Sequence, residues 1–396
     1  MKKILHLIML CVPLLLITAC DVHEFPEDNG VRIPFMLHLD FNTALPIYEE
    51  ITYTRSDETE ESYNSHDLRY IVKAYRVYDE EEENRNEEAT FVFTKSDLTN
   101  LNYTARLELT EGTYRFLIWT DYVDAGTNLD KYYDTSNFEE IILLNKNNHS
   151  GSNDYRDCFR GYTTGTVQNP AIYTGAALEK IDNQATAEMI RPMGKFKFVS
   201  TDVERFLTRV AKMLKEREER KKNSTQKSLA DTLEYSFSDI FEFADGEEIK
   251  VELNSEEAYK ELLSKINLGE FTVLFRYSSN MPCSFNMFTN KPAYAWGGVN
   301  FTSKMYVDND ALNNKELILG FDYIFVNGLE TPLSIKIEIY DIDNELVAAT
   351  EAIDFRVIRS HLTIIRGEFL TAEAKGGVSI NPSYDGNDYN HEIKFK

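Results

Sequence analysis

The chain has 396 residues, and its 42 Lys and Arg against 66 Asp and Glu give a formal charge of −24. This balance argues against nucleic-acid binding, because neutralising phosphates requires clustered Lys and Arg, and the single basic run, 217–222, also contains Glu218 and Glu219. A hydrophobic content of 42% with only 10 Pro and 18 Gly is typical of a folded chain. At roughly 150 residues per domain, the length predicts two to three domains.

The N-terminus predicts export. Two lysines follow Met1, and residues 4–17 are apolar apart from His6. That run is shorter than the roughly 20 residues of a membrane-spanning helix, so it reads as the core of a signal peptide. No other apolar run approaches 18 residues, which predicts that the rest of the chain is soluble.

The signal peptide ends in a cysteine. The sequence Ile17-Thr18-Ala19-Cys20 resembles the lipobox of bacterial lipoproteins, which implies removal of residues 1–19 and acylation of Cys20. Acyl chains would hold the protein at a membrane without a transmembrane helix. The alternative is ordinary signal-peptide cleavage beside a chance cysteine. Without its two N-terminal lysines the chain would carry 40 basic and 66 acidic groups, or about −26.

Two other cysteines would remain in the mature protein, Cys158 and Cys283. An exported protein can form disulfides, but spacing in the sequence does not give distance in space. The two residues could therefore form a disulfide or remain separate buried thiols.

The first part of the mature chain carries strand signals. Residues 20–30 are polar and suit a tether, and 31–180 are predicted to form an N-terminal β-sandwich. Segments 103–109 and 113–120 alternate around the turn Glu111-Gly112, which predicts a β-hairpin. The Asn-, Ser- and Gly-rich segment 145–154 is typical of a loop.

A C-terminal β-sandwich with helical insertions is predicted for residues 181–396. It would begin with a strand pair within 185–200, broken at 192–194. Apolar residues at helical spacing then follow a capping box formed by Thr201 and Glu204, which predicts an amphipathic helix over one end of a sheet. A second short helix is expected from Asn254 to Gly269. Strand patterns return beyond it, so the expected fold is mainly β, with two sandwich domains.

Catalytic and metal motifs are absent from the sequence. It has no H-E-x-x-H, G-x-S-x-G or P-loop motif, and its seven histidines are scattered. The acidic loops 308–310 and 385–388 miss the EF-hand pattern. No cofactor or metal site is predicted, and the chain is expected not to be an enzyme. A hydrolase would need two carboxylates converging in one pocket, and the sequence does not identify such a pair.

Two tryptophans could in principle stack on sugar rings. Trp119 lies in a predicted strand and is expected in the core. Trp296 precedes Gly297-Gly298 in a predicted loop and is the candidate glycan platform. A surface glycan-binding lipoprotein is therefore the alternative function.

Several segments mark a resemblance: CDVHEFPE from Cys20, RPMGKFKFVSTDVERF at 191–206, MPCSFNMFTNKP at 281–292, LGFDYIFVNG at 319–328 and HLTIIRGEFLT at 361–371. Together they resemble an uncharacterised family of Bacteroides-type lipoproteins similar in plan to the fimbrillins and fimbrial anchor lipoproteins of Bacteroidetes. The resemblance implies two transthyretin-like sandwiches, a lipidated N-terminus, transfer to the outer membrane and no enzyme activity. Residues 216–248 depart from it by being longer and more charged.

The resemblance also implies a class of partner. Fimbrillin-type subunits polymerise by strand addition, in which a donated strand completes an open sandwich. Stalk subunits of this kind lose an N-terminal strand after an arginine, whereas an anchor would keep it, so Arg55 is expected to remain uncleaved. The last segment, 391–396, is expected to be an ordinary edge strand, with a donated strand as the alternative. The leading prediction is a fimbrial anchor or accessory subunit on the periplasmic or outer face of the outer membrane.

Overall fold

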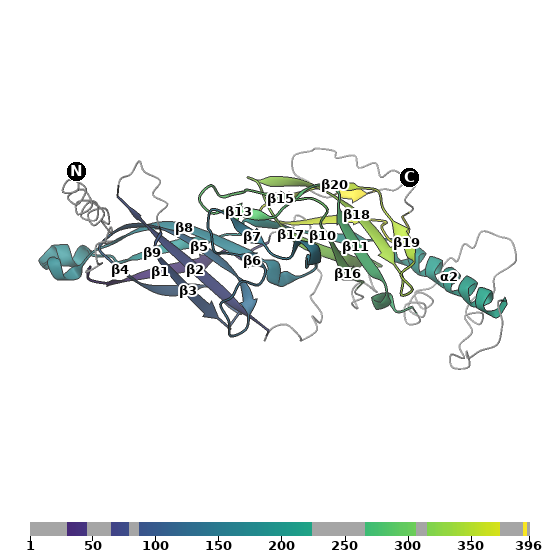
Figure 1. The fold of residues 1–396 in the computed structure, drawn as a ribbon, viewed down its shortest axis with the longest axis horizontal. Helices are drawn as coiled ribbons and strands as arrows, with labels where there is room; N and C mark the ends of the chain where they lie inside the picture. The colour runs from purple at the N-terminus through teal and green to yellow at the C-terminus, as the bar shows by residue number, and fades with distance from the viewer. Residues whose placement is uncertain are drawn as a thin grey trace, which may run out of the picture.

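The computed structural model describes residues 30–45, 65–78, 87–223, 266–305, 315–372 and 391–393. Within them the chain is mainly β, as the sequence predicts. Sheets formed by the N-terminal strands lie toward one end of the long axis, and those formed by the C-terminal strands lie toward the other (Figure 1). We call these two groups of sheets the first body and the second body.

The first body consists of two sheets, with strand orders β4-β1-β9 and β3-β2-β5-β8. Its strands are β1 (Ile33–Phe41), β2 (His66–Val77), β3 (Glu87–Lys95), β4 (Tyr103–Leu109), β5 (Gly112–Asp124), β8 (Cys158–Val167) and β9 (Gln184–Met189). Alternate residues of both sheets point inward and form one buried cluster. Phe35, Leu107 and Phe116 are among its fully buried members. Two layers around a shared apolar core are consistent with a β-sandwich.

The predicted hairpin at 103–120 is wrong. Both strands exist, but β4 pairs with β1 in one sheet while β5 pairs with β2 and β8 in the other. The turn at Glu111-Gly112 therefore carries the chain from one layer to the other. The two strands bury their apolar faces against each other across the core, so they cannot also be neighbours in one sheet.

The second body also has two larger sheets, with orders β17-β10-β21-β22 and β16-β11-β18-β19, and β20 also pairs with β18. Its strands are β10 (Met193–Ser200), β11 (Thr272–Tyr277), β16 (Asn300–Lys304), β17 (Leu317–Phe325), β18 (Glu330–Tyr340), β19 (Leu346–Ala349), β20 (Ile353–Ile358), β21 (Leu362–Gly367) and β22 (His391–Ile393). Inward residues such as Phe196, Phe198 and Ile337 form its core. The C-terminal β22 runs parallel to β21 at the edge of its sheet.

Helix α2 (Val203–Asn223) follows β10 and projects at the far end of the second body (Figure 1). Val203, Phe206, Leu207 and Val210 are buried, and the Phe206 ring packs edge-on against Phe271 at 5.3 Å. The predicted amphipathic helix is therefore present, although it begins only after Asp202. Most of the predicted second helix lies outside the described residues, and its C-terminal end is the 3-10 turn η6 (Leu268–Glu270).

The predicted strand pair within 185–200 is also wrong. β9 pairs with β1 in the first body, whereas β10 pairs with β17 and β21 in the second. Ala187 and Met189 of β9 are buried in the first core. Strand pairing thus changes from one body to the other between residues 189 and 193, later than the expected boundary at 180.

Short strands from both halves of the sequence combine between the bodies. β6 (Tyr133–Asp134) and β7 (Ile141–Leu143) come from the β5–β8 connection, while β13 (Ser284–Asn286) and β14 (Lys291–Pro292) come from the β11–β16 connection. They form one sheet in the order β14-β13-β7-β6. Beside it, β12 (Met281–Pro282) pairs with β15 (Ala295–Trp296). The sheet β14-β13-β7-β6 covers the outer face of β5. Through it, residues of the two bodies belong to one apolar cluster.

Candidate functional site

Of the predicted site residues, Cys158, Cys283 and Trp296 lie within the described chain. Cys20 is outside the described residues, as is Arg55. Cys158 and Cys283 are both free and buried, so the possible disulfide is not formed. The Cys158 thiol instead lies 3.3 Å from the sulfur of Met193, and Cys283 sits between β12 and β13 with its carbonyl accepting a bond from the Leu143 N–H.

The two tryptophans have different surroundings. Trp119 is fully buried, as expected, and its ring lies 5.5 Å from Tyr133, 6.5 Å from Phe285 and 6.4 Å from Phe325. Trp296 lies in strand β15, not in a loop, and its half-buried ring packs against the shared apolar cluster. The interior face of Trp296 is therefore already occupied by the protein.

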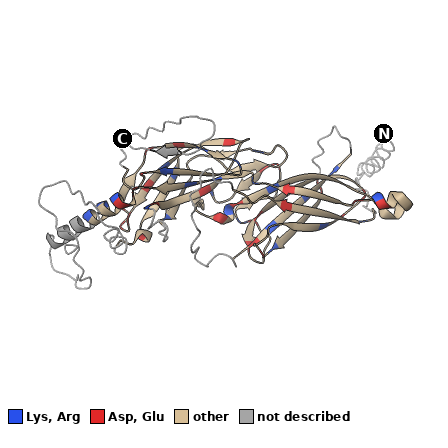
Figure 2. Cartoon of the chain, turned by 180° about the vertical axis from the view of Figure 1, so that it is seen from behind, with Lys and Arg blue, Asp and Glu red and all other residues tan. Residues whose placement is uncertain are grey.

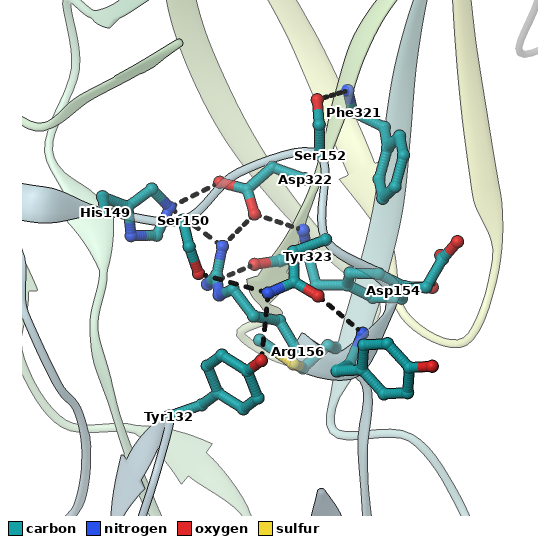
Figure 3. A network of polar contacts seen from close by, with 12 residues as sticks. Tyr132, His149, Ser150, Ser152, Asp154, Arg156, Phe321, Asp322 and Tyr323 are labelled. Atoms are coloured by element: carbon teal, nitrogen blue, oxygen red, sulfur yellow. Dashed lines mark hydrogen bonds and ion pairs between the residues drawn. The ribbon is translucent and has the colours of Figure 1, made fainter. Parts of the chain in front are cut away.

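The most concentrated polar chemistry lies where the two bodies meet. Asp322 of β17 accepts hydrogen bonds from Arg156 Nη1, from His149 Nε2 at 2.7 Å and from the hydroxyl of Tyr277 at 2.7 Å. Arg156 Nη2 also donates to the carbonyl of Tyr323 at 3.2 Å. Figure 3 shows Asp322 facing His149 and Arg156, which come from the β7–β8 connection of the first body. We call these four residues, His149, Arg156, Tyr277 and Asp322, the junction network.

Burial gives the junction network its electrostatic character. The side chains of His149, Arg156 and Asp322 are at most 2% exposed. Burial acts to raise the pKa of Asp322, but Arg156 and then His149 outweigh it, so the pKa lies below its ordinary value. Burial and then Arg156 lower the pKa of His149, so the ring is neutral near pH 7. The network therefore holds one buried ion pair hydrogen-bonded by neutral groups.

The segment 149–156 lies against the second body along its length. The Ser152 N–H donates to the carbonyl of Phe321 at 2.7 Å, and the Phe321 N–H donates to Ser152 Oγ at 3.2 Å (Figure 3). Asp154 accepts from Lys195 Nζ at 2.6 Å and from the Tyr323 hydroxyl at 2.9 Å. A Cβ atom at Gly151 would lie only 2.2 Å from the Phe301 ring, so glycine is required for this close approach.

The direct connection between the bodies is also fixed. Arg191, which lies between β9 and β10, is 6% exposed and forms an ion pair with Asp157 at 2.8 Å. Its carbonyl accepts from Arg359 Nε at 3.2 Å and from Ser360 Oγ at 3.1 Å. Buried, hydrogen-bonded backbone cannot change its dihedral angles without losing these bonds. The connection therefore acts as a fixed joint.

The polar groups of the junction network hold the structure together and are not placed to act on a substrate. The histidine, arginine and carboxylate satisfy one another and are closed to solvent, so no substrate can reach them. Among the described residues, no group of three or more His, Cys, Asp or Glu is placed to hold a metal ion. The described helices also include none that is both long and apolar enough to cross a membrane.

The sequence did not indicate the junction network. Segment 145–154 has the composition of a solvated loop, and Asp322 lies 166 residues beyond Arg156. The one local signal is the presence of His149, Asp154 and Arg156 within a single short connection. Nothing in that pattern identifies β17 as the partner.

A family model described as a family of unknown function (DUF6562) matches residues 34–395, so the chain belongs to that family. No curated protein sequence is significantly similar to it. Among solved structures, a fimbrial anchor protein from Porphyromonas gingivalis has 8% identity and a TM-score of 0.35, with coverage of 92% of this chain and 97% of the other. A fimbrial assembly protein from Parabacteroides distasonis has 11% identity and a TM-score of 0.34, with coverage of 93% and 100%. The family model confirms the expectation that the chain belongs to an uncharacterised family.

Proposed function

We propose that this member of the DUF6562 family is a non-enzymatic, lipid-anchored protein of the outer membrane or cell surface that serves as a fimbrial anchor or accessory subunit. The observation that carries the proposal is the junction, where a buried ion pair, a shared sheet and a fixed connection join two β bodies end to end. A molecule whose two bodies are joined in this way transmits force along its length without bending between them. This property suits a protein held at one end and attached to a partner elsewhere.

For the architecture, we propose two tandem transthyretin-like sandwiches, the second carrying α2 as an insertion. The predicted division at 180 needs to move, because β9 completes a sheet of the first body. We place it at the connection around Arg191. The signal peptide at 1–19 and the tether at 20–30 remain part of this proposal.

The state of the buried carboxylates supports a non-enzymatic role. Asp121, Asp157 and Asp322 are all buried, and each forms an ion pair with an arginine. A carboxylate held in this way is not free to act as a general acid or base, so these groups do not form the pair that a hydrolase needs. The packing of Trp296 on the apolar cluster leaves only part of its ring for a sugar, so we do not favour the glycan-binding alternative.

We propose strand addition as the mode of contact with fimbrial subunits. In the described part of the chain, β3 pairs only with β2 and so forms one edge of its sheet. Its inward residues Phe91 and Phe93 are only half-buried against the first core. An added strand would gain main-chain hydrogen bonds along β3 and would cover these rings. Lysines at the exposed positions Thr90 and Val92 would disfavour such pairing, so the double variant should retain fewer fimbriae per cell while the folded protein is still produced.

Lipid attachment is tested at Cys20. In the native bacterium, Cys20→Ala should abolish incorporation of labelled fatty acid and release the protein from the membrane fraction. It should also increase the fimbriae shed into the medium. Cys11→Ala is the matched control, because it removes a cysteine from the signal peptide and should leave all three readouts unchanged. Retention of Cys20→Ala in the membrane with unaltered processing would refute lipid anchoring.

A further inference from the structure

The β8–β9 loop, residues 168–183, exposes apolar side chains at one end of the molecule. It contains the 3-10 turns η3 (Pro170–Ile172) and η4 (Gly175–Lys180). Ile172 is 62% exposed and Leu178 is 44% exposed, and residues 169–178 carry no charge. In Figure 2 this loop is the coil at the outer end of the first body, tan except where charged residues adjoin the sheets. Two exposed aliphatic side chains within one uncharged segment are the starting point for a contact surface.

The loop is held in a defined shape by its base. The side chain of Asn183 accepts from the Gln168 N–H at 2.9 Å, and its Nδ2 donates to the Gln168 carbonyl at 2.9 Å. The Asn169 side chain accepts from the Ala171 N–H at 3.0 Å and so caps η3. Because both ends of the loop are tied, the apolar side chains are presented outward instead of folding back onto the sheets.

The loop lies at the same end of the first body as the N-terminal tether. The Met36 N–H of β1 donates to the carbonyl of Asn183 at 2.9 Å, so the base of the loop adjoins the start of β1. Val31, two residues before β1, is 64% exposed. It lies eleven residues after Cys20, and a chain of that length spans at most about 40 Å. An acyl group on Cys20 would therefore keep this end close to the lipid.

We propose that the β8–β9 loop is a second membrane contact, which inserts Ile172, Leu178 and Val31 into the interfacial region of the bilayer that holds the acyl chains. This inference rests on the proposed lipid anchor. The half-buried Tyr173 suits the boundary between acyl chains and headgroups. The contact would fix the direction in which the rigid body leaves the membrane.

The partner is the apolar part of the bilayer and not a charged surface. The connection between β2 and β3 starts at the same end, because Val77 pairs with Thr113 beside the turn at Gly112. That connection contains the acidic run 79–83. Anionic headgroups would be repelled by it. The contact should therefore form on zwitterionic lipid and should not strengthen when anionic lipid is added.

The test places a fluorophore in the loop of the full-length lipidated protein. Ala177→Cys, labelled with an environment-sensitive dye, is reconstituted into phosphatidylcholine vesicles that carry a lipid-linked quencher. The native Cys158 and Cys283 are buried and leave the introduced thiol as the site of labelling. The matched control is Ile342→Cys, whose side chain is 68% exposed in the β18–β19 turn of the second body. We expect a blue shift and quenching at position 177 and neither at position 342.

Two further arms separate the loop from the anchor. In a chain carrying Cys20→Ala, the emission of the label at 177 should still shift to the blue at high lipid concentration. Adding Leu178→Ser should weaken the partitioning of this chain into the vesicles roughly tenfold, because one leucine side chain is no longer buried in lipid. A lipidated protein that stays in the membrane with a water-exposed label at 177 overturns the loop contact while leaving the anchor intact. A Cys20→Ala chain that still incorporates labelled fatty acid refutes the anchor at Cys20, whereas a shifted label at 177 in a chain that carries no fatty acid supports the loop contact. A shift that depends on protein concentration without lipid assigns the loop to self-association and overturns the proposal.

Discussion

Replacement of Asp322 by alanine should weaken the junction more than any surface substitution. Asp322 accepts bonds from Arg156, His149 and Tyr277, and its side chain is 1% exposed. Its removal would leave the Arg156 guanidinium buried without an opposite charge. Breaking a buried ion pair by removing one partner costs about 3–5 kcal/mol. We expect a loss of that size in the free energy of unfolding.

Urea unfolding followed by circular dichroism and by tryptophan fluorescence measures this loss. Trp119 lies in the apolar part of the junction, so its emission reports on separation of the bodies. The control is Glu330→Ala, which breaks the ion pair with Arg356 at a site where both side chains are about 40% exposed. A surface pair contributes about 0–1 kcal/mol. The two variants therefore remove the same kind of interaction, one from a buried site and one from an exposed site.

A double variant distinguishes the contribution of the ion pair to stability from the contribution of side-chain packing. Arg156→Met with Asp322→Leu removes both charges and keeps apolar volume, and such exchanges are often neutral in buried pairs. We expect the double variant to recover the part of the lost stability that comes from the unpaired Arg156 charge, while the loss of the bonds from His149 and Tyr277 remains. If Asp322→Ala lost no more stability than Glu330→Ala, the junction network would not hold the bodies together as argued.

Three other outcomes are expected. The pKa of His149 is lower in the folded than in the unfolded chain, so on acidification the unfolded chain takes up a proton at this residue at a higher pH. The free energy of unfolding should therefore fall as the pH drops below 6.5. His149→Gln should reduce this dependence of the melting temperature on pH. Gly151→Ala should cost about 1–3 kcal/mol in urea unfolding, since the new Cβ would displace the Phe301 ring; an unchanged midpoint would contradict the close approach. Burial raises the pKa of both Cys158 and Cys283, the latter to about 11, so neither thiol should react with a disulfide reagent until urea unfolds the chain, and rapid reaction in buffer would contradict their burial.

Local patterns in the sequence predicted the elements but not which of them pair. Alternation identified β4 and β5, and apolar residues at helical spacing identified α2. The hairpin prediction failed because two consecutive alternating strands can pair side by side or face each other across a core. Both arrangements bury the same alternate residues, so the pattern is identical in the two cases. The difference lies in which distant strands, β1 or β2 and β8, take the ladder hydrogen bonds.

The junction could not be predicted for a related reason. Polar residues in a short connection are satisfied equally well by water or by a partner elsewhere in the chain, and composition does not distinguish the two. His149 and Arg156, at the two ends of segment 149–156, are buried where β17 presents Asp322 and the backbone of Phe321 to the segment. The hydrogen-bond partners of a buried polar group thus depend on the tertiary arrangement. The apolar face of a strand, in contrast, can be recognised from the alternation of apolar residues in the sequence.

The use of charge at the junction has a consequence for how the bodies are oriented. An apolar interface tolerates small rotations, because apolar contacts have no preferred direction. The junction network tolerates few, since a displaced Asp322 would leave Arg156, His149 and Tyr277 unsatisfied in a site that water cannot reach. We therefore attribute to the network the single relative orientation of the bodies, and to the surrounding aromatic cluster most of their adhesion. In a protein held at one end by lipid, a fixed orientation lets a contact at the β8–β9 loop determine where the edge of β3 and the far end of the second body point.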